Sequence, residues 1–270
     1  MTTDESQHNR VTSAAAGVVS KVPEVTVVFW ITKALTTGMG ESSSDYLVHT
    51  LPPAVAVLLG FLALLGALAI QFRARRYVPW IYWLAVAMVG VFGTMAADVL
   101  HVGLGVPYAV STVFFAVALA AVFTVWFLTE RTLSIHSIYT PRRELFYWAA
   151  VVTTFALGTA AGDLSAVTLH RGYFSSGVMF AIVILVPAVA HWRFGMNPIL
   201  AFWFAYIVTR PLGASFADWL GVSHRRGGLA LGPGPVSLSL AALIVACVAY
   251  LTVTDSKVRD STARSGEHVA

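Results

Sequence analysis

The sequence predicts an all-α integral membrane protein with about eight transmembrane helices. Of its 270 residues, 57% are hydrophobic and only 11% are charged, whereas soluble domains carry about 25% charged residues. Apolar segments of the length that crosses a ~30 Å hydrocarbon layer recur along the whole chain. These segments lie at residues 25–48, 53–71, 79–101, 107–129, 144–169, 173–192, 198–220 and 236–253.

One pattern of seventeen residues occurs four times, once in every second predicted helix. Each copy begins with Phe or Tyr followed by Trp, has Gly ten residues after the Trp, a small residue four positions further on, and Asp at the end. The copies are FWITKALTTGMGESSSD (29–45), YWLAVAMVGVFGTMAAD (82–98), YWAAVVTTFALGTAAGD (147–163) and FWFAYIVTRPLGASFAD (202–218). They align without gaps, which indicates an internal repeat.

Each repeat is predicted to be a helical hairpin, in which a motif helix is followed by a plainer return helix. All motif helices cross in the same direction, so the four repeats are parallel and related by pseudo-symmetry about the membrane normal. The predicted membrane domain covers residues 23–254, with repeats at 23–72, 76–130, 141–193 and 196–254. Polar cytoplasmic tails are predicted at 1–22 and 255–270.

The positive charges are distributed unequally between the two predicted sides of the membrane. Of the 17 Lys and Arg residues, one side holds only Arg171, Arg225 and Arg226, while the other holds the tails and most of the basic loops. Because basic loops stay in the cytoplasm, both termini are expected there. The net charge of +4 then reflects topology and contact with anionic lipid headgroups, and not binding to nucleic acid.

The segment VPEVTVVFWITKALTTGMGESSSDYL (22–47) resembles the repeat of an uncharacterised family of bacterial multi-pass membrane-anchored proteins, which are built from tandem copies of a repeat of unknown function. The first copy matches best, in VPEV, FW, Lys33 and TTGMGE, and the later copies keep mainly the aromatic–Trp pair, Gly and Asp. The resemblance spans nearly all of residues 21–253. It implies the repeat architecture and a bacterial cytoplasmic (inner) membrane, and it brings no activity.

The glycine and the small residue of each motif lie four positions apart, on one face of the helix. Small residues at this spacing let helix backbones approach closely in lipid. We therefore expect the motif helices to form an inner ring joined through Gly40, Gly93, Gly158 and Gly213. The motif tryptophans, near the predicted cytoplasmic boundary, are typical of an aromatic belt, with the lining of a ligand path as the alternative.

The motif aspartates are the main candidates for function. A carboxylate buried in a membrane is costly unless it is paired, solvated or protonated, and one near a helix C-terminus is also disfavoured by the helix dipole. Two interpretations remain open: a shared polar site that binds an ion or substrate, or structural capping and hydrogen bonding. The four residues are Asp45, Asp98, Asp163 and Asp218.

Repeats one and four carry further charges inside their motif helices, namely Lys33, Glu41 and Arg210. Since the other copies have no counterparts of these types, we predict that Glu41 and Arg210 pair with each other, with Lys33 as the next candidate partner of Glu41. Together with Asp45, these charges either neutralise one another as a buried network or form a site whose charge changes during function.

A histidine follows every motif aspartate, at irregular spacing. Carboxylate and imidazole ligands suit divalent transition metals, so a divalent metal ion is the candidate cofactor, although loop histidines also occur without one. The candidate metal ligands are His49, His101, His170 and His224.

The leading interpretation is a small transporter or channel-like carrier for a cation, either proton-coupled or a divalent metal. The motif aspartates would bind the ion, and Glu41, Lys33 and Arg210 would tune the charge. Because H-E-x-x-H, G-x-S-x-G and P-loop motifs are absent, the sequence favours a protein that is not an enzyme. The expected partners are the lipid bilayer and a small ion or solute.

Two alternatives remain: a membrane-embedded metal-dependent enzyme, and a structural or sensory scaffold. A transporter needs a water-accessible route from both sides during its cycle. An enzyme needs a pocket on one side, with two or more histidines close to the acids. A scaffold needs paired aspartates and no cavity.

Overall fold

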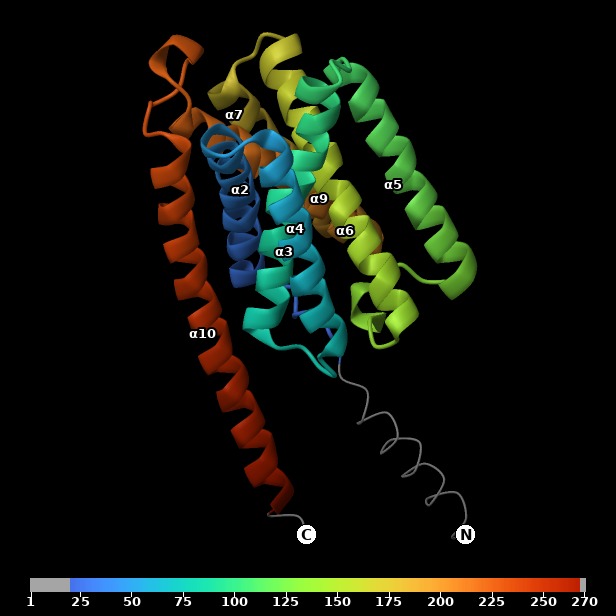
Figure 1. Ribbon diagram of the computed structural model, residues 1–270. Coiled ribbons are helices and arrows are strands. Elements are labelled where there is room, and N and C mark those ends of the chain that lie inside the picture. Colours follow the sequence, from blue (N-terminus) through green and yellow to red (C-terminus); the bar gives the residue numbers. More distant parts are fainter. Residues whose placement is uncertain (1–19, 268–270) are drawn as a thin grey trace, which may run out of the picture.

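The computed structural model describes residues 20–267, and every regular element in this range is a helix (Figure 1). The predicted tail at 1–22, apart from residues 20–22, and the last three residues of the predicted tail at 255–270 lie outside the described residues. The long helices are α2 (Val27–Thr50), α3 (Pro53–Arg73), α4 (Pro79–Asp98), α5 (Tyr108–Glu130), α6 (Pro141–Asp163), α7 (Tyr173–Val183), α8 (Leu185–Phe194), α9 (Pro198–Gly221) and α10 (Pro233–Glu267). Two π-helical turns, η1 (Val99–Gly103) and η3 (Leu164–Thr168), and two 3₁₀ turns, η2 (Ile135–Ser137) and η4 (His224–Arg226), complete the description.

The helix boundaries follow from local sequence. Proline occupies the first position of α3, α4, α6, α9 and α10, where its missing N–H is not needed and its φ already suits a helix. The side chains of Thr26, Thr140 and Asn197 accept hydrogen bonds from backbone N–H groups in the first turns of α2, α6 and α9. Between α7 and α8 the helix is interrupted at Ile184, because Pro187 cannot donate to the carbonyl four residues earlier.

Within residues 20–267, seven helical segments are long and apolar enough to cross a membrane, where eight spans were predicted. They are Pro53–Arg73, Pro79–His101, Tyr108–Glu130, Pro141–Thr168, Tyr173–Phe194, Pro198–Gly221 and Pro233–Ser256. The exception is α2, which is 24 residues long but carries Lys33, Glu41 and many hydroxyl residues. These polar side chains are buried against other helices, so the helix is polar toward the protein interior.

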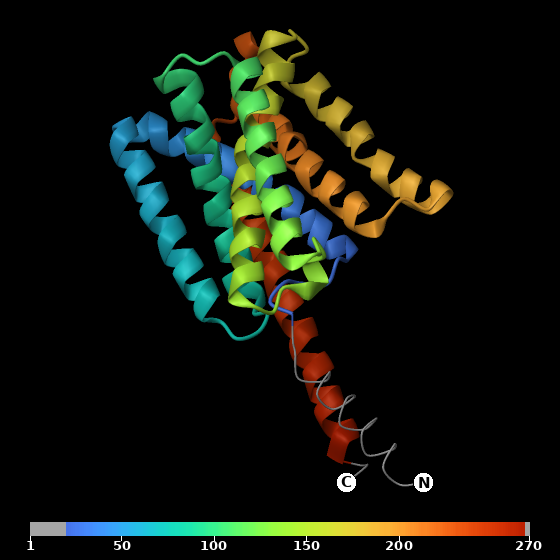
Figure 2. The same ribbon diagram turned by 90° about the vertical axis from the view of Figure 1, so that its right-hand side faces the viewer.

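The four motif helices form a closed inner ring. Helix α2 packs against α4, α4 against α6, α6 against α9, and α9 against α2. The return helices lie outside this ring: Figure 2 shows α3 and the α7–α8 pair on opposite outer sides. Each return helix packs mainly on the motif helix of the next repeat, that is α3 on α4, α5 on α6, α7 on α9, and α10 on α2. The last contact joins repeat four to repeat one, so the arrangement is cyclic.

The motif glycines face the neighbouring motif helix around the whole ring. A Cβ atom on Gly40 would lie 2.6 Å from the carbonyl carbon of Gly90, so only a glycine lets these two backbones approach so closely. At every interface the facing residue occupies the same motif position, three residues before the glycine of its own helix. The facing pairs are Gly40 with Gly90, Gly93 with Phe155, Gly158 with Arg210, and Gly213 with Thr37.

Three of the four motif tryptophans are buried, which differs from the aromatic belt that the sequence suggested. Trp83, Trp148 and Trp203 are 1%, 2% and 4% exposed and belong to one hydrophobic cluster with Tyr82 and Tyr147. The hydroxyl groups of Tyr82 and Tyr147 are hydrogen-bonded to each other at 2.5 Å. This aromatic layer fills the ring near the first turns of the motif helices, and it is part of the core instead of a lipid-facing anchor.

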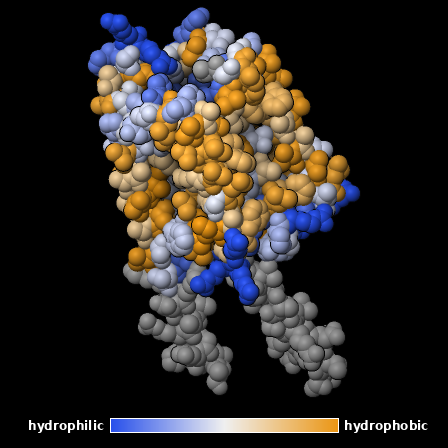
Figure 3. Space-filling view, in the orientation of Figure 1, coloured by the Kyte–Doolittle hydropathy of each residue, from blue (hydrophilic) through white to orange (hydrophobic). Residues whose placement is uncertain are grey.

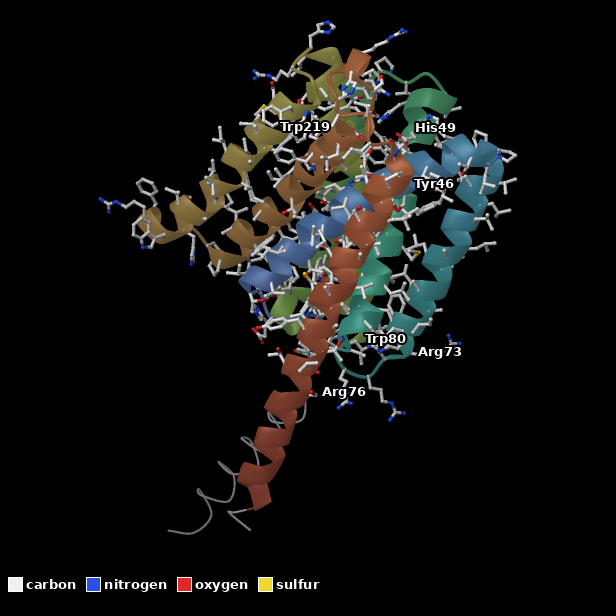
Figure 4. The ribbon with its side chains drawn as sticks, turned by 90° about the vertical axis from the view of Figure 1, so that its left-hand side faces the viewer. Tyr46, His49, Arg73, Arg76, Trp80 and Trp219 are labelled. Atoms are coloured by element: carbon white, nitrogen blue, oxygen red, sulfur yellow. The ribbon has the colours of Figure 1, made fainter. Side chains whose placement is uncertain are left out.

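Apolar side chains cover the middle of the molecular surface, and hydrophilic ones gather toward its two ends (Figure 3). Figure 4 shows Arg73, Arg76 and Trp80 at one end, and Tyr46 and His49 at the other. We call the first the basic end and the second the carboxylate end, because the motif helices finish there with their aspartates. An apolar band between two polar ends is the surface expected of a protein that spans a bilayer.

Substitution of Gly40 by leucine is predicted to destabilise the bundle by roughly 1–3 kcal/mol or more, because the new side chain would push against the backbone of α4. The matched control is Gly66→Leu on α3, where a Cβ atom meets nothing within 4 Å. The measurement is the melting temperature of each variant in detergent, followed by size-exclusion chromatography after heating. Equal melting temperatures for the two variants would contradict the close contact between α2 and α4.

Candidate functional site

A single arginine connects all four motif helices at the centre of the ring. Arg210 on α9 is fully buried. Its Nη1 donates to the backbone carbonyl of Thr37 at 2.8 Å, and its Nη2 donates to Glu41 Oε2 at 2.6 Å and to Thr159 Oγ1 at 2.8 Å. Nη2 also donates to Thr94 Oγ1. We call these five residues the Arg210 layer.

The Arg210 layer follows the repeat. Glu41, Thr94 and Thr159 occupy the same motif position in repeats one, two and three, and each directs an oxygen to the guanidinium group. The fourth copy has Ala214 at this position, and its helix supplies the arginine instead. Closure of the ring of motif helices therefore brings equivalent motif positions together at the ring centre. There, three hydrogen-bond acceptors surround the guanidinium group of Arg210.

The predicted pair of Glu41 and Arg210 is present. It is an ion pair of 2.6 Å, with the side chains 6% and 0% exposed. A buried pair of this kind is strongly destabilised when one partner is removed, because the other charge is left uncompensated. Arginine suits the position because its planar group donates in several fixed directions and stays charged.

Lys33 does not join this hydrogen-bonded network. Its side chain is buried, and its Nζ lies 3.9 Å and 4.0 Å from the ring centroids of Phe155 and Tyr206. Within residues 20–267 the ammonium group has no hydrogen-bond partner. Lys33 therefore forms a cation–π layer below Arg210, and Glu41 pairs with Arg210 and not with Lys33.

All four motif aspartates line one cavity at the carboxylate end. Each lies four residues, or about one helical turn of 5–6 Å, beyond the acceptor position of the Arg210 layer. The cavity has a volume of about 700 Å³, and Glu41 also lines it. Around the acids lie, among others, His49, Tyr108, Tyr173 and Arg226. We call this space the carboxylate cavity; it contains residues from every repeat.

The carboxylates of this cavity are not neutralised by basic side chains. Within the described part of the chain, none of the four aspartates forms an ion pair with Lys or Arg, whereas Glu41 is already paired with Arg210. Arg226 lines the cavity too, but its Nη2 donates to the hydroxyl of Tyr173. A solute that enters this space would meet carboxyl oxygens from all four repeats.

One of the four candidate histidines lies close to two of the acids. Ligand atoms of Asp98, His101 and Asp163 all lie within 4.8 Å of one another, and His101 Nδ1 is 3.8 Å from Asp163 Oδ2. The other three histidines do not join this group. The Nδ1 atoms of His49 and His224 contact the carbonyl oxygens of Asp45 and Gly228 at 2.6 Å and 2.9 Å, and His170 is exposed.

A family model described as Repeat of Unknown Function (DUF347) matches the chain four times, at residues 28–77, 81–132, 146–197 and 201–257. The chain belongs to the DUF347 family. Neither the curated proteins nor the solved structures give a match. The four DUF347 copies correspond to the four repeats seen in the sequence, and each contributes one helix to the ring.

The DUF347 bundle also contains a polar cluster at the basic end that the sequence did not predict. Glu144 is fully buried; it pairs with Lys21 at 2.6 Å and accepts a hydrogen bond of 2.9 Å from Gln71. The one signal for this cluster in the sequence was Glu144 itself, an additional acidic residue near the start of the third motif helix. Glu144 lies in the first turn of α6, Gln71 in the last turn of α3 and Lys21 before α2. The cluster therefore connects the chain before α2 to repeats one and three.

A second cavity, of about 800 Å³, lies toward the basic end between α2, α8 and α9. Its lining includes Trp30, Phe202, Pro187 and the histidines His136 and His191, but none of its lining residues is Asp, Glu, Lys or Arg. Of these two cavities in the DUF347 protein, only the carboxylate cavity is lined by acidic side chains.

Proposed function

We propose that this membrane protein carries a cation, and that the carboxylate cavity is the site where the cation binds. The observation that supports this most strongly is the convergence of Asp45, Asp98, Asp163 and Asp218 on one cavity, with no Lys or Arg partner among the described residues. Ionisable residues within membrane spans commonly mark ion pathways, because burying them is otherwise unfavourable.

The Arg210 layer is the proposed barrier below the site. Glu41 lines the cavity and also holds Arg210, so a cation that reaches Glu41 would compete with the guanidinium group. Loss of the Glu41–Arg210 pair would loosen the contact between repeats one and four. Lys33 lies one layer further in, against the rings of Phe155 and Tyr206.

The scaffold alternative is less consistent with this geometry, since it calls for paired aspartates and no cavity. The enzyme alternative retains one supporting observation. The cavity lies at one end and the Asp98–His101–Asp163 group resembles the donor set of a metal centre that activates water. An enzyme would convert a substrate without accumulating a cation across the bilayer.

We further propose that the protein lies in the bacterial cytoplasmic membrane with its basic end in the cytoplasm. The loops at this end contain Arg73, Arg75, Arg76 and Arg131, and basic loops are retained on the cytoplasmic side. By the same reasoning both termini are cytoplasmic, and the carboxylate cavity faces the outside.

Transport is predicted to depend on the motif aspartates. Full-length protein in liposomes that contain a metal-sensitive dye should take up divalent cations, and Asp→Asn changes at positions 45, 98, 163 and 218 should each lower the rate about tenfold or more, which corresponds to ~1.4 kcal/mol. The control is Glu24→Gln, an exposed acid at the basic end. The proposal fails if divalent cations, monovalent cations and protons all cross no faster than in protein-free liposomes, or if the quadruple variant transports normally.

The orientation can be tested with single cysteines in a Cys247→Ser background. A membrane-impermeant thiol reagent applied to intact cells should label Arg225→Cys at the carboxylate end, because this end is proposed to face outward. Ser256→Cys, near the end of the α10 span, should react only after the cells are opened. Labelling of Ser256→Cys alone in intact cells would reverse the orientation, and labelling of both would contradict the arrangement of spans.

A further inference from the structure

The ring of His101 lies beside Asp98 and Asp163, two of the aspartates that line the carboxylate cavity. This side chain is only 7% exposed, and its ring packs edge-on against Tyr108, with 4.6 Å between the ring centroids. Its Nε2 lies 2.7 Å from Ser111 Oγ. Helix α5 therefore fixes the direction in which the other nitrogen, Nδ1, points.

The hydrogen bonds of Ser111 define the tautomer of His101. The Ser111 hydroxyl has one proton, and it lies 3.0 Å from the carbonyl oxygen of Tyr108 and 3.4 Å from that of Pro107. Both carbonyls are acceptors, so we assign the hydroxyl as a donor to the backbone and as an acceptor from His101 Nε2–H. In the neutral imidazole the lone pair is then on Nδ1.

This lone pair points toward two carboxylates. Nδ1 is buried without a hydrogen-bond partner within residues 20–267, and Asp163 Oδ2, at 3.8 Å, is too far away for a hydrogen bond. Asp98 completes a group whose ligand atoms all lie within 4.8 Å of one another. Three electron-pair donors that face one another in a partly buried space repel unless a cation or a proton lies between them.

We propose that His101 Nδ1 and the carboxylates of Asp98 and Asp163 bind a divalent first-row transition metal ion, such as Zn²⁺, Mn²⁺ or Co²⁺. The inference rests on the proposed cation site and names the class of cation. Imidazole together with carboxylates suits these metals, whereas Mg²⁺ and Ca²⁺ prefer oxygen ligands alone. Ser111 is the positioning residue that orients the histidine, as outer hydrogen bonds commonly do in metal sites.

The backbone supports the assignment to repeats two and three. The π-helical turns η1 and η3 begin directly after Asp98 and Asp163, whereas α2 and α9 continue as α-helices through Asp45 and Asp218. Such turns are uncommon in proteins, and those that occur are often located at functional sites. Here η1 carries His101 beside the two acids, and repeats one and four have no equivalent turn.

The test is metal binding by the purified full-length protein in detergent, with Co²⁺ as a spectroscopic probe. We expect one Co²⁺ per chain, with visible absorption bands that Zn²⁺ abolishes and excess Mg²⁺ does not. His101→Gln and Asp163→Asn should weaken binding by about 100-fold or more, and Ser111→Ala, which leaves all ligands in place, by about 10–100-fold. The matched control is His170→Gln, because this histidine is exposed and should not affect binding.

Absence of Co²⁺ binding by the wild-type protein, or equal binding by wild type and His101→Gln, would overturn the assignment. Melting temperatures of all variants show whether a loss of binding reflects loss of fold, and Ser111→Ala provides a second, milder change if His101→Gln does not fold. Metal binding without transport would support the proposed metal site and refute the proposed carrier function. Transport that is unchanged in His101→Gln would support the carrier and refute this site.

Discussion

The structure depends on one buried cation, the guanidinium group of Arg210. It donates to a backbone carbonyl, a carboxylate and two hydroxyl groups that come from three other helices, so the ring closes only if all four repeats are in register. Glycine makes this possible, because a Cβ atom at Gly158 would overlap the Arg210 side chain. Burial of the charge is compensated by Glu41, and the helix contacts and the electrostatics therefore support each other.

The same interaction explains why the aspartates, one turn further out, have no Lys or Arg partner in the part of the chain that the structure describes. Glu41 uses the positive charge of Arg210, and Lys33 lies on the opposite side of this layer against two aromatic rings. The backbones of the repeats are nearly equivalent, but a point on the axis has room for only one large side chain. Divergence between the copies is thus required where they meet, and the outer cavity keeps four carboxyl groups for the proposed cation site.

Much of this arrangement could be predicted from the sequence, because its signals are short-range. The recurring spacing of Trp, Gly and Asp predicted four parallel repeats, and two charges without counterparts predicted the pair of Glu41 and Arg210. Other features depend on which neighbouring helices each helix face packs against, and the spacing of residues in the sequence does not determine this. The return helices pack on the next repeat, Trp83, Trp148 and Trp203 are in the core, and α2 hides its polar residues inside the bundle. Of the four candidate histidines, His101 is the one grouped with Asp98 and Asp163, because a π-helical turn and Ser111 place it there.

The most direct test of the central claim is a double-mutant cycle between repeats one and four. Glu41→Gln and Arg210→Met should each destabilise the protein by about 3–5 kcal/mol, since each leaves a buried charge unpaired. The double variant should lose clearly less unfolding free energy than the sum of the losses in the two single variants. Glu130 and Arg142, whose side chain is 70% exposed, form the control pair, for which a coupling below ~1 kcal/mol is expected. Strictly additive effects of the Glu41 and Arg210 changes would contradict the account.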